Sequence, residues 1–154
     1  MEVAMAEARV AFKQDEVPIG AVIVLGDQII GRAGNQVELL KDATAHAELL
    51  AITQAFAACG EKRIPEAELF CTVEPCLMCA GAILHARIKR VVYATPDPKF
   101  GGVESLTKLF ELPSLNHQVV ACKGPLGTES GDLLREFFRM KRRDAKQRGI
   151  RREE

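Results

Sequence analysis

The chain has 154 residues, of which 47% are hydrophobic and 27% are charged, and its formal net charge at pH 7 is zero. Length and composition are typical of a globular protein with one hydrophobic core, so we expect a single domain over residues 1–154. There is no run of about 18 apolar residues, which excludes a transmembrane helix. Residues Met1–Ala4 lack the basic region of a signal peptide, so the sequence predicts a cytoplasmic protein.

Hydrophobic periodicity predicts helices that alternate with short apolar strands. The expected helices span residues 2–14, 45–59, 75–87, 103–112 and 129–149. The expected strands span residues 21–25, 28–32, 69–73, 90–95 and 118–122. This alternation predicts an α/β fold, a three-layer α-β-α sandwich around a central mixed sheet of about five strands.

Local signals refine three of these boundaries. The first two strands form a hairpin around the Gly26-Asp27 turn. Residues 34–43 are expected to form a polar loop, after which Thr44 caps the second helix. Pro75 is expected in the first turn of the third helix, where its missing N–H is harmless.

Charge is distributed unevenly along the chain. From Arg135 to Glu154 there are nine bases and four acids, a net charge of +5, which leaves −5 for residues 1–134. A basic end on an acidic domain is typical of proteins that bind a polyanion. A solvated helix face would give the same pattern, so charge alone leaves both interpretations open.

Two cysteines, Cys76 and Cys79, have the spacing of paired metal ligands or of a redox motif. A distant segment adds His46 and, two residues later, Glu48. One imidazole and two thiolates are the ligand set of a catalytic zinc site whose fourth position is left for water. Glu48 is then free to transfer protons. Side chains two apart on a helix do not face each other, so we expect the site to lie beyond the end of the second helix.

The other cysteines are expected to be small apolar core residues. An odd count of five, without a signal peptide, argues against a disulfide framework. The residues concerned are Cys59, Cys71 and Cys122.

The motif order His-x-Glu, then Pro-Cys-x-x-Cys, is the known signature of zinc deaminases. Together with Phe137–Met140 and Leu115–His117, the segments Thr44–Glu48 and Glu74–Ala82 resemble the bacterial tRNA-specific adenosine deaminases. That family belongs to the zinc-dependent cytidine and deoxycytidylate deaminase superfamily. The similarity runs from about residue 3 to residue 142.

The resemblance implies a cytidine deaminase-like fold, a homodimer and one zinc ion per subunit, bound by His46, Cys76 and Cys79. It implies conversion of adenosine to inosine at the wobble position (34) of a tRNA anticodon, with zinc-activated water attacking carbon C6 and Glu48 transferring protons. It also implies substrate contacts by Asn35, Ala47, Asp97, Lys99, Asn116, Phe138 and Arg139.

Several of these residues have simpler explanations. Asn35 follows Gly34 as a turn asparagine would, and Phe138 has the pattern of a core residue. His85 and His117 are expected to be structural. The chain also departs from the family, because prolines flank Asp97 and stiffen the loop that contacts substrate there.

Two other functions remain compatible with the zinc motif. A deaminase of free guanine or another nucleobase shares the motif, but such an enzyme has no use for a basic tail. A non-catalytic zinc-binding module would need a fourth ligand, such as Cys71 or Cys122, and would have no need of the unligated Glu48.

Overall fold

The computed structural model describes residues 1–147 and 149. Its centre is a five-stranded sheet in the order β2-β1-β3-β4-β5. The hairpin strands β1 (Gly20–Leu25) and β2 (Gln28–Gly34) are antiparallel, and β1 is also antiparallel to β3 (Ala67–Val73). β4 (Arg90–Thr95) and β5 (Val120–Lys123) continue parallel to β3. The predicted mixed sheet is confirmed.

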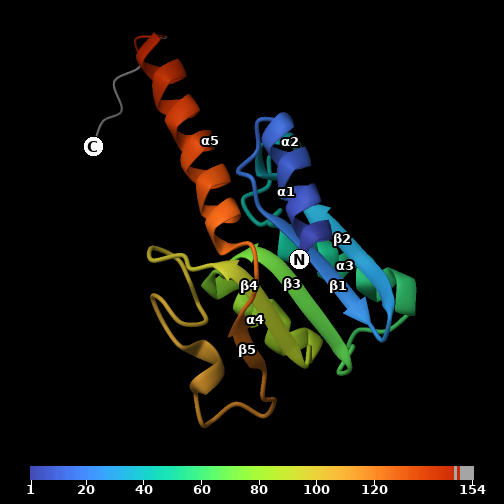
Figure 1. Ribbon diagram of the computed structural model, residues 1–154. Helices are drawn as coiled ribbons and strands as arrows, with labels where there is room; N and C mark the ends of the chain where they lie inside the picture. The colour runs from blue at the N-terminus through green and yellow to red at the C-terminus, as the bar shows by residue number, and fades with distance from the viewer. Residues whose placement is uncertain (148, 150–154) are drawn as a thin grey trace.

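Helices cover both faces of this sheet (Figure 1). α1 (Glu2–Lys13) packs on β1 and β2, and α5 (Gly127–Gln147) packs on β3 and β4 of the same face. α3 (Ala47–Cys59) lies on the opposite face, where it contacts α4 (Leu77–Ala86). The predicted three-layer α/β class is therefore confirmed.

Small residues bring the helices close to the sheet. Ala51 and Ala55 of α3 are fully buried, and Gly31 of β2 faces them. A Cβ on Gly31 would lie 2.2 Å from the carbonyl oxygen of Ala51, so any other residue there would force the helix away. This close contact fixes the position of α3, whose N-terminus carries His46.

The structure differs from the sequence-based prediction in one loop and in one helix. The expected polar loop 34–43 contains a one-turn helix, α2 (Val37–Leu40). The expected helix over residues 103–112 is reduced to the 3₁₀ turn η1 (Leu109–Glu111). The Gly101 carbonyl accepts from the Leu106 N–H and the Gly102 carbonyl accepts from the Leu109 N–H, five and seven residues on and not four, so no α-helical turn forms there.

Both ligand-bearing helices begin later than predicted. α3 begins at Ala47, with His46 and not Thr44 at the N-cap, because the Thr44 hydroxyl bonds to Asp42. α4 begins at Leu77, with Cys76 at the N-cap, so Pro75 precedes the helix.

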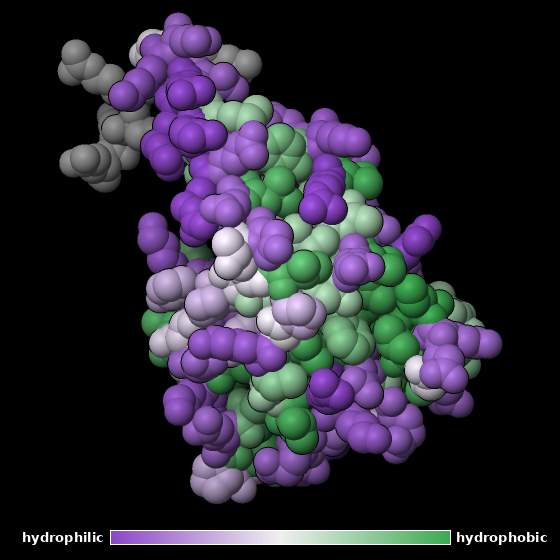
Figure 2. Space-filling model, in the orientation of Figure 1, coloured by the Kyte–Doolittle hydropathy of each residue, from purple (hydrophilic) through white to green (hydrophobic). Residues whose placement is uncertain are grey.

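The C-terminal helix α5 is the most polar element of the fold. It extends beyond the sheet, and hydrophilic residues crowd its outer part (Figures 1 and 2). The predicted helix over 129–149 is found as Gly127–Gln147, and residues 148 and 150–154 of the predicted basic tail lie outside the described residues. Within the described part of the chain, no helix has both the length and the apolar character needed to cross a membrane.

Candidate active site

The structure brings His46, Cys76 and Cys79 together in one group. His46 Nδ1 lies 3.6 Å from Cys76 Sγ and 3.5 Å from Cys79 Sγ. The three ligand atoms all lie within 4.8 Å of one another. An imidazole and two thiolates at this separation fit a tetrahedral metal such as zinc, with one position open. The group can therefore hold a metal ion.

The backbone explains how distant segments reach one point. His46 is the extended N-cap of α3, with φ −73° and ψ 149°. Cys76 is the extended N-cap of α4, with φ −69° and ψ 172°, and Cys79 lies within the first turn of that helix. Because His46 precedes the helix and Glu48 belongs to its first turn, both side chains reach the same region. The group of ligands therefore lies beyond the N-terminal end of α3, as expected from the sequence.

Two helix N-termini therefore point at the group, and their positive ends favour thiolates there. Hydrogen bonding by Cys79, followed by that of His46, lowers the pKa of Cys76 to about 4. The same Cys76 thiolate raises the pKa of the Cys79 thiol. Without a metal the pair thus holds one negative charge, and a metal ion must displace the second proton.

Glu48 is a buried carboxyl group beside these ligands. It is 3% exposed, and its Oε2 has no hydrogen-bond partner among the described residues. Burial raises the pKa of Glu48 to about 7. A buried polar atom without a protein partner is rare, and it marks a place where a ligand or water completes the structure.

The remaining cysteines do not join the group. Cys71 is fully buried in the core and its Sγ lies 3.9 Å from the carbonyl oxygen of Val92. Cys122 lies on β5, near Arg90, and Cys59 lies at the end of α3. Within the described residues, the three-membered group has no fourth protein ligand.

Asn35 lies in the buried interior and is oriented by a residue that sequence analysis missed. Its Nδ2 donates to Glu16 Oε2 at 3.2 Å, and Glu16 Oε1 accepts from the Leu39 N–H at 2.7 Å. Asn35 and Glu16 are 4% and 1% exposed. The bond to Glu16 leaves Asn35 Oδ1 available to a ligand. Burial, which separates Asn35 from an ordinary turn asparagine, is not visible in the sequence.

Three further expected residues lie close to the ligands in the fold. Ala47, fully buried, is the first residue of α3 and follows His46 directly. Asp97 and Lys99 lie in the loop after β4, which pairs with Cys76 through a bridge at Gly101. The structure therefore places this loop beside the metal-binding group.

The adjacent residues Phe137 and Phe138 on α5 differ in their burial. Phe137 is 4% exposed and packs edge-on against Phe12, whereas Phe138 is 42% exposed. The core residue of the pair is Phe137, not Phe138. Arg139 follows on the exposed surface of the helix.

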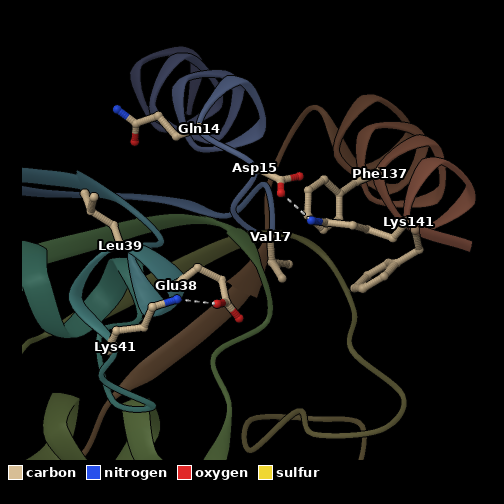
Figure 3. Close-up of a pocket in the computed structure, with 9 residues that line it drawn as sticks. Gln14, Asp15, Val17, Glu38, Leu39, Lys41, Phe137 and Lys141 are labelled. Carbon is tan, nitrogen blue, oxygen red and sulfur yellow. Dashed lines mark hydrogen bonds and ion pairs between the residues drawn. The ribbon is translucent and has the colours of Figure 1, made fainter. Parts of the chain in front are cut away.

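A hollow of about 560 Å³ lies between α2 and α5 (Figure 3). Asp15 and Lys141 form an ion pair of 2.6 Å across one side of it. It is separate from the metal-binding group, and it is lined by Gln14, Asp15, Val17, Glu38, Leu39, Lys41, Phe137, Phe138 and Lys141.

Asn116 is not brought to the group. Its Oδ1 accepts a bond of 2.8 Å from Arg87, at the end of α4 opposite Cys76. A ten-residue helix is about 15 Å long, which is too far for contact with the same base. The neighbouring His117 lies 2.8 Å from the carbonyl oxygen of Ile88, as a structural histidine would.

Comparison with known proteins gives a consistent result. The family model described as MafB19-like deaminase matches residues 1–142. A tRNA-specific adenosine deaminase of Agrobacterium fabrum is 49% identical over 144 residues, which cover 94% of this chain and 95% of that protein. The enzyme of the same name from Aquifex aeolicus is 45% identical and covers 90% and 91% of the two chains.

Solved structures agree with these relatives. A structure from a study of A-to-I editing by tRNA:A34 deaminases at the wobble position has a TM-score of 0.84 and 48% identity, covering 87% of this chain and 97% of that one. A guanine deaminase from Nitrosomonas europaea has a TM-score of 0.75 at 23% identity, covering 87% and 80%, and shares the fold. The chain therefore belongs to the family of tRNA-specific adenosine deaminases.

Proposed function

We propose that this protein deaminates adenosine to inosine at the wobble position of a tRNA anticodon and releases ammonia. The observation that supports this most directly is the buried Glu48 beside the group of His46, Cys76 and Cys79. The similarity to named tRNA-specific adenosine deaminases over most of the chain supplies the substrate. A tRNA substrate also supports the predicted cytoplasmic location.

The three ligand residues would hold one zinc ion per subunit. Zinc bound there would lower the pKa of a water molecule and so supply a nucleophile at neutral pH. The fit rests on the donor set, which has two sulfurs and one imidazole nitrogen within reach of one ion.

Glu48 would carry the protons. It would take one proton from the attacking water and deliver it to the ring nitrogen next to the reacting carbon. It would then take the second water proton from the new hydroxyl on that carbon and deliver it to the departing amine. Its buried Oε2 has no protein partner among the described residues, and a substrate nitrogen can take that place. The net reaction adds water and releases ammonia.

The base would be held by residues at the end of β2 and at the start of α3. Asn35, oriented by Glu16, offers an oxygen acceptor, and the Ala47 backbone lies next to His46. The loop with Asp97 and Lys99 would contact the nucleotide path. For Asn116 the support is family resemblance alone, because it lies at the far end of α4.

RNA beyond the reacting base would contact α5. Phe138 is exposed, as a surface on which a base stacks must be, and Arg139 follows it. An anticodon loop is single-stranded, so turning its base out of the stack costs less than in a duplex.

We also propose a homodimer. Large apolar side chains are exposed at the start of α4 and in the loop after β4, where a monomer would leave them in water. Both segments adjoin Cys76, because Leu77 follows it in the chain and the loop after β4 pairs with it at Gly101. A second copy on this surface would therefore lie next to the active site. The exposed residues are Leu77, Met78 and Leu106.

The function is tested with the zinc-loaded protein and a short anticodon stem-loop RNA. We expect inosine at the wobble position and an equal amount of ammonia. A matched RNA with its adenosine moved by one position should give far less product, and Glu48→Gln controls for a contaminating deaminase. If the wild-type protein forms no inosine at the wobble position, the proposed function is wrong.

A further inference from the structure

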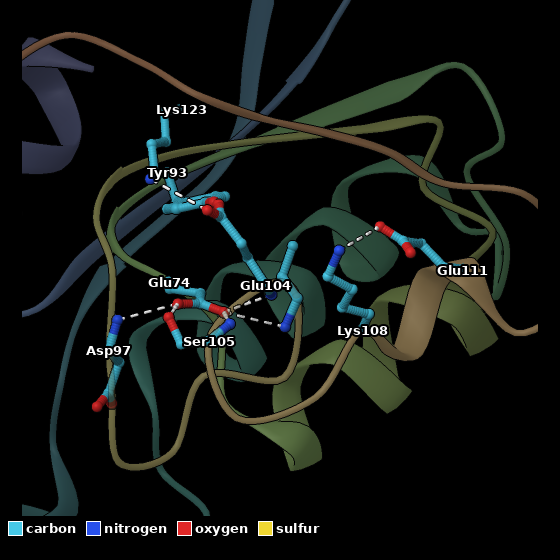
Figure 4. A network of polar contacts seen from close by, with 9 residues as sticks. Glu74, Tyr93, Asp97, Glu104, Ser105, Lys108, Glu111 and Lys123 are labelled. Carbon is cyan, nitrogen blue, oxygen red and sulfur yellow. Dashed lines mark hydrogen bonds and ion pairs between the residues drawn. The ribbon is translucent and has the colours of Figure 1, made fainter.

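A second buried carboxylate lies next to the metal ligands without joining them. Glu74 is 2% exposed and directly follows β3, two residues before Cys76. Its carboxylate accepts bonds from both ends of one loop, residues 96–105 (Figure 4). The donors are the N–H groups of Asp97 (3.0 Å), Val103 (3.2 Å), Glu104 (2.7 Å) and Ser105 (2.9 Å), and the Ser105 hydroxyl.

These bonds satisfy both oxygens of the buried Glu74 carboxylate. A neutral side chain would lose most of this stabilisation, because hydrogen bonds to a charged group are stronger.

The loop is packed tightly around this carboxylate. The Gly102 N–H donates to the Pro75 carbonyl at 2.8 Å, and the Gly101 N–H donates to the Asp97 carbonyl at 2.9 Å. A Cβ on Gly101 would lie 2.4 Å from the Glu74 carboxyl atoms. Any side chain at position 101 would therefore push the Glu74 carboxylate away from its hydrogen-bond donors.

A second attachment holds the returning part of the loop. Glu104 accepts a hydrogen bond from the Tyr93 hydroxyl on β4 and forms an ion pair of 3.1 Å with Lys123 on β5 (Figure 4). The loop is therefore fixed to the sheet at Glu104 and to the start of α4 at Glu74.

The tip of the loop is exposed. The Asp97 carboxylate accepts from the N–H groups of Lys99 and Phe100, which forms a tight turn. Lys99 is exposed and Phe100 is 65% exposed. A cation and an aromatic ring thus project from a rigid base next to Cys76.

We propose that Glu74 is a positioning residue for RNA. It holds the loop 96–105 in the shape that presents Lys99 and Phe100 to nucleotides next to the deaminated base. This inference rests on the proposed function. Glu74 does not contact the reacting atoms, so its effect is on binding and not on the chemical step.

The test compares Glu74→Gln with wild type and with Glu68→Gln. Glu68 lies on the same strand β3, but its carboxylate pairs with Arg90 at 3.2 Å. In Glu74→Gln an amide group replaces one acceptor oxygen and faces N–H donors. We expect KM for the stem-loop to rise by about tenfold or more, the effect of losing one charge-assisted bond, with kcat nearly unchanged. Glu68→Gln should match wild type.

Two further measurements separate positioning from a general loss of structure. Amide hydrogen exchange in Glu74→Gln should accelerate at residues 97 and 103–105, while zinc content stays at the wild-type value. Should Glu74→Gln fail to fold, Ser105→Ala removes one of the donors and should raise KM in the same direction by a smaller factor.

The outcomes distinguish the two proposals. A wild-type protein without stem-loop activity contradicts the proposed function. An active wild type together with unchanged KM and exchange in Glu74→Gln contradicts the positioning role. A fall in kcat or in zinc content without a rise in KM also contradicts it, because Glu74 would then support the metal ligands and not the loop.

Discussion

The side-chain nitrogen of Asn35 donates a hydrogen bond to Glu16 Oε2 at 3.2 Å, and both residues are buried. This bond fixes the orientation of the Asn35 amide, because the nitrogen is held by Glu16 and the oxygen is not. In Glu16→Gln one acceptor oxygen is replaced by an NH₂ group. The Asn35 amide could then rotate so that its oxygen accepts from this group. Loss of an oriented hydrogen bond to a charged group is worth roughly 1.5–3 kcal/mol, so kcat/KM should fall by about tenfold or more.

Glu66→Gln is the matched control for this change, because Glu66 forms an exposed ion pair with Lys89. It should leave kcat/KM within about twofold of wild type, as a surface ion pair contributes little. Steady-state kinetics on the stem-loop compares the two variants. Equal values for Glu16→Gln and Glu66→Gln would show that the orientation of Asn35 does not matter.

Replacing Glu48 by Gln tests the proton transfers. The amide has nearly the same shape, so fold and zinc content should persist. General acid–base steps typically contribute about 10²- to 10⁴-fold, and a residue that serves several transfers should lie at the upper end of this range. Single-turnover rates measure the effect. A rate within about tenfold of wild type would mean that another group moves the protons.

The open metal site predicts different results for two neighbouring cysteines. Cys79→Ala should lose the metal, whereas Cys71→Ala should retain one zinc per chain because Cys71 Sγ is directed at Val92. Metal analysis of the purified variants gives the stoichiometry. X-ray absorption of the wild type should find two sulfur ligands at about 2.3 Å, and a third sulfur would contradict the open site.

The basic surface of α5 predicts a change in salt dependence. Arg139 and Arg142 are three residues apart on the helix, exposed, and so on one face. Lys141 is already engaged by Asp15 and the Phe137 ring, so it should contribute less. Neutralising both arginines should weaken stem-loop binding and flatten the salt slope by about 0.7 for each RNA phosphate that the variant no longer neutralises.

The control removes two charges elsewhere. Lys62 and Arg63 are exposed in the loop after α3, whose 13 residues place them about 20 Å from His46. Their double neutralisation should leave the salt slope unchanged. If both double variants behave alike, the charge on α5 is only a solvated helix face.

The metal group and Glu48 were predictable because two short motifs carry them. A helix start converts the local spacing of Cys76 and Cys79 into adjacent side chains, and this needs no knowledge of distant packing. Side chains two apart on a helix do not face each other, but His46 precedes the helix, so it and Glu48 can reach the same region. The predicted start at residue 45 was wrong because the Thr44 hydroxyl bonds to Asp42 and not to the helix.

The two supporting carboxylates could not be predicted. Glu16 is 19 residues from Asn35, and the donors to Glu74 are 23 to 31 residues away. Such contacts depend on which loops meet after folding. A single sequence gives no sign that an acid is buried, since most acids are exposed. The helix expected near residue 103 was wrong because the backbone there forms bonds that span five and seven residues in place of the four of an α-helix.

We propose that the site acts on an anticodon loop and not on a free base. The direct measurement is ammonia release by the zinc-loaded protein from an anticodon stem-loop and from free guanine, each as kcat/KM under the same conditions. We expect a preference for the stem-loop of at least about 10²-fold. Efficient release from guanine, without release from the stem-loop, would contradict the claim.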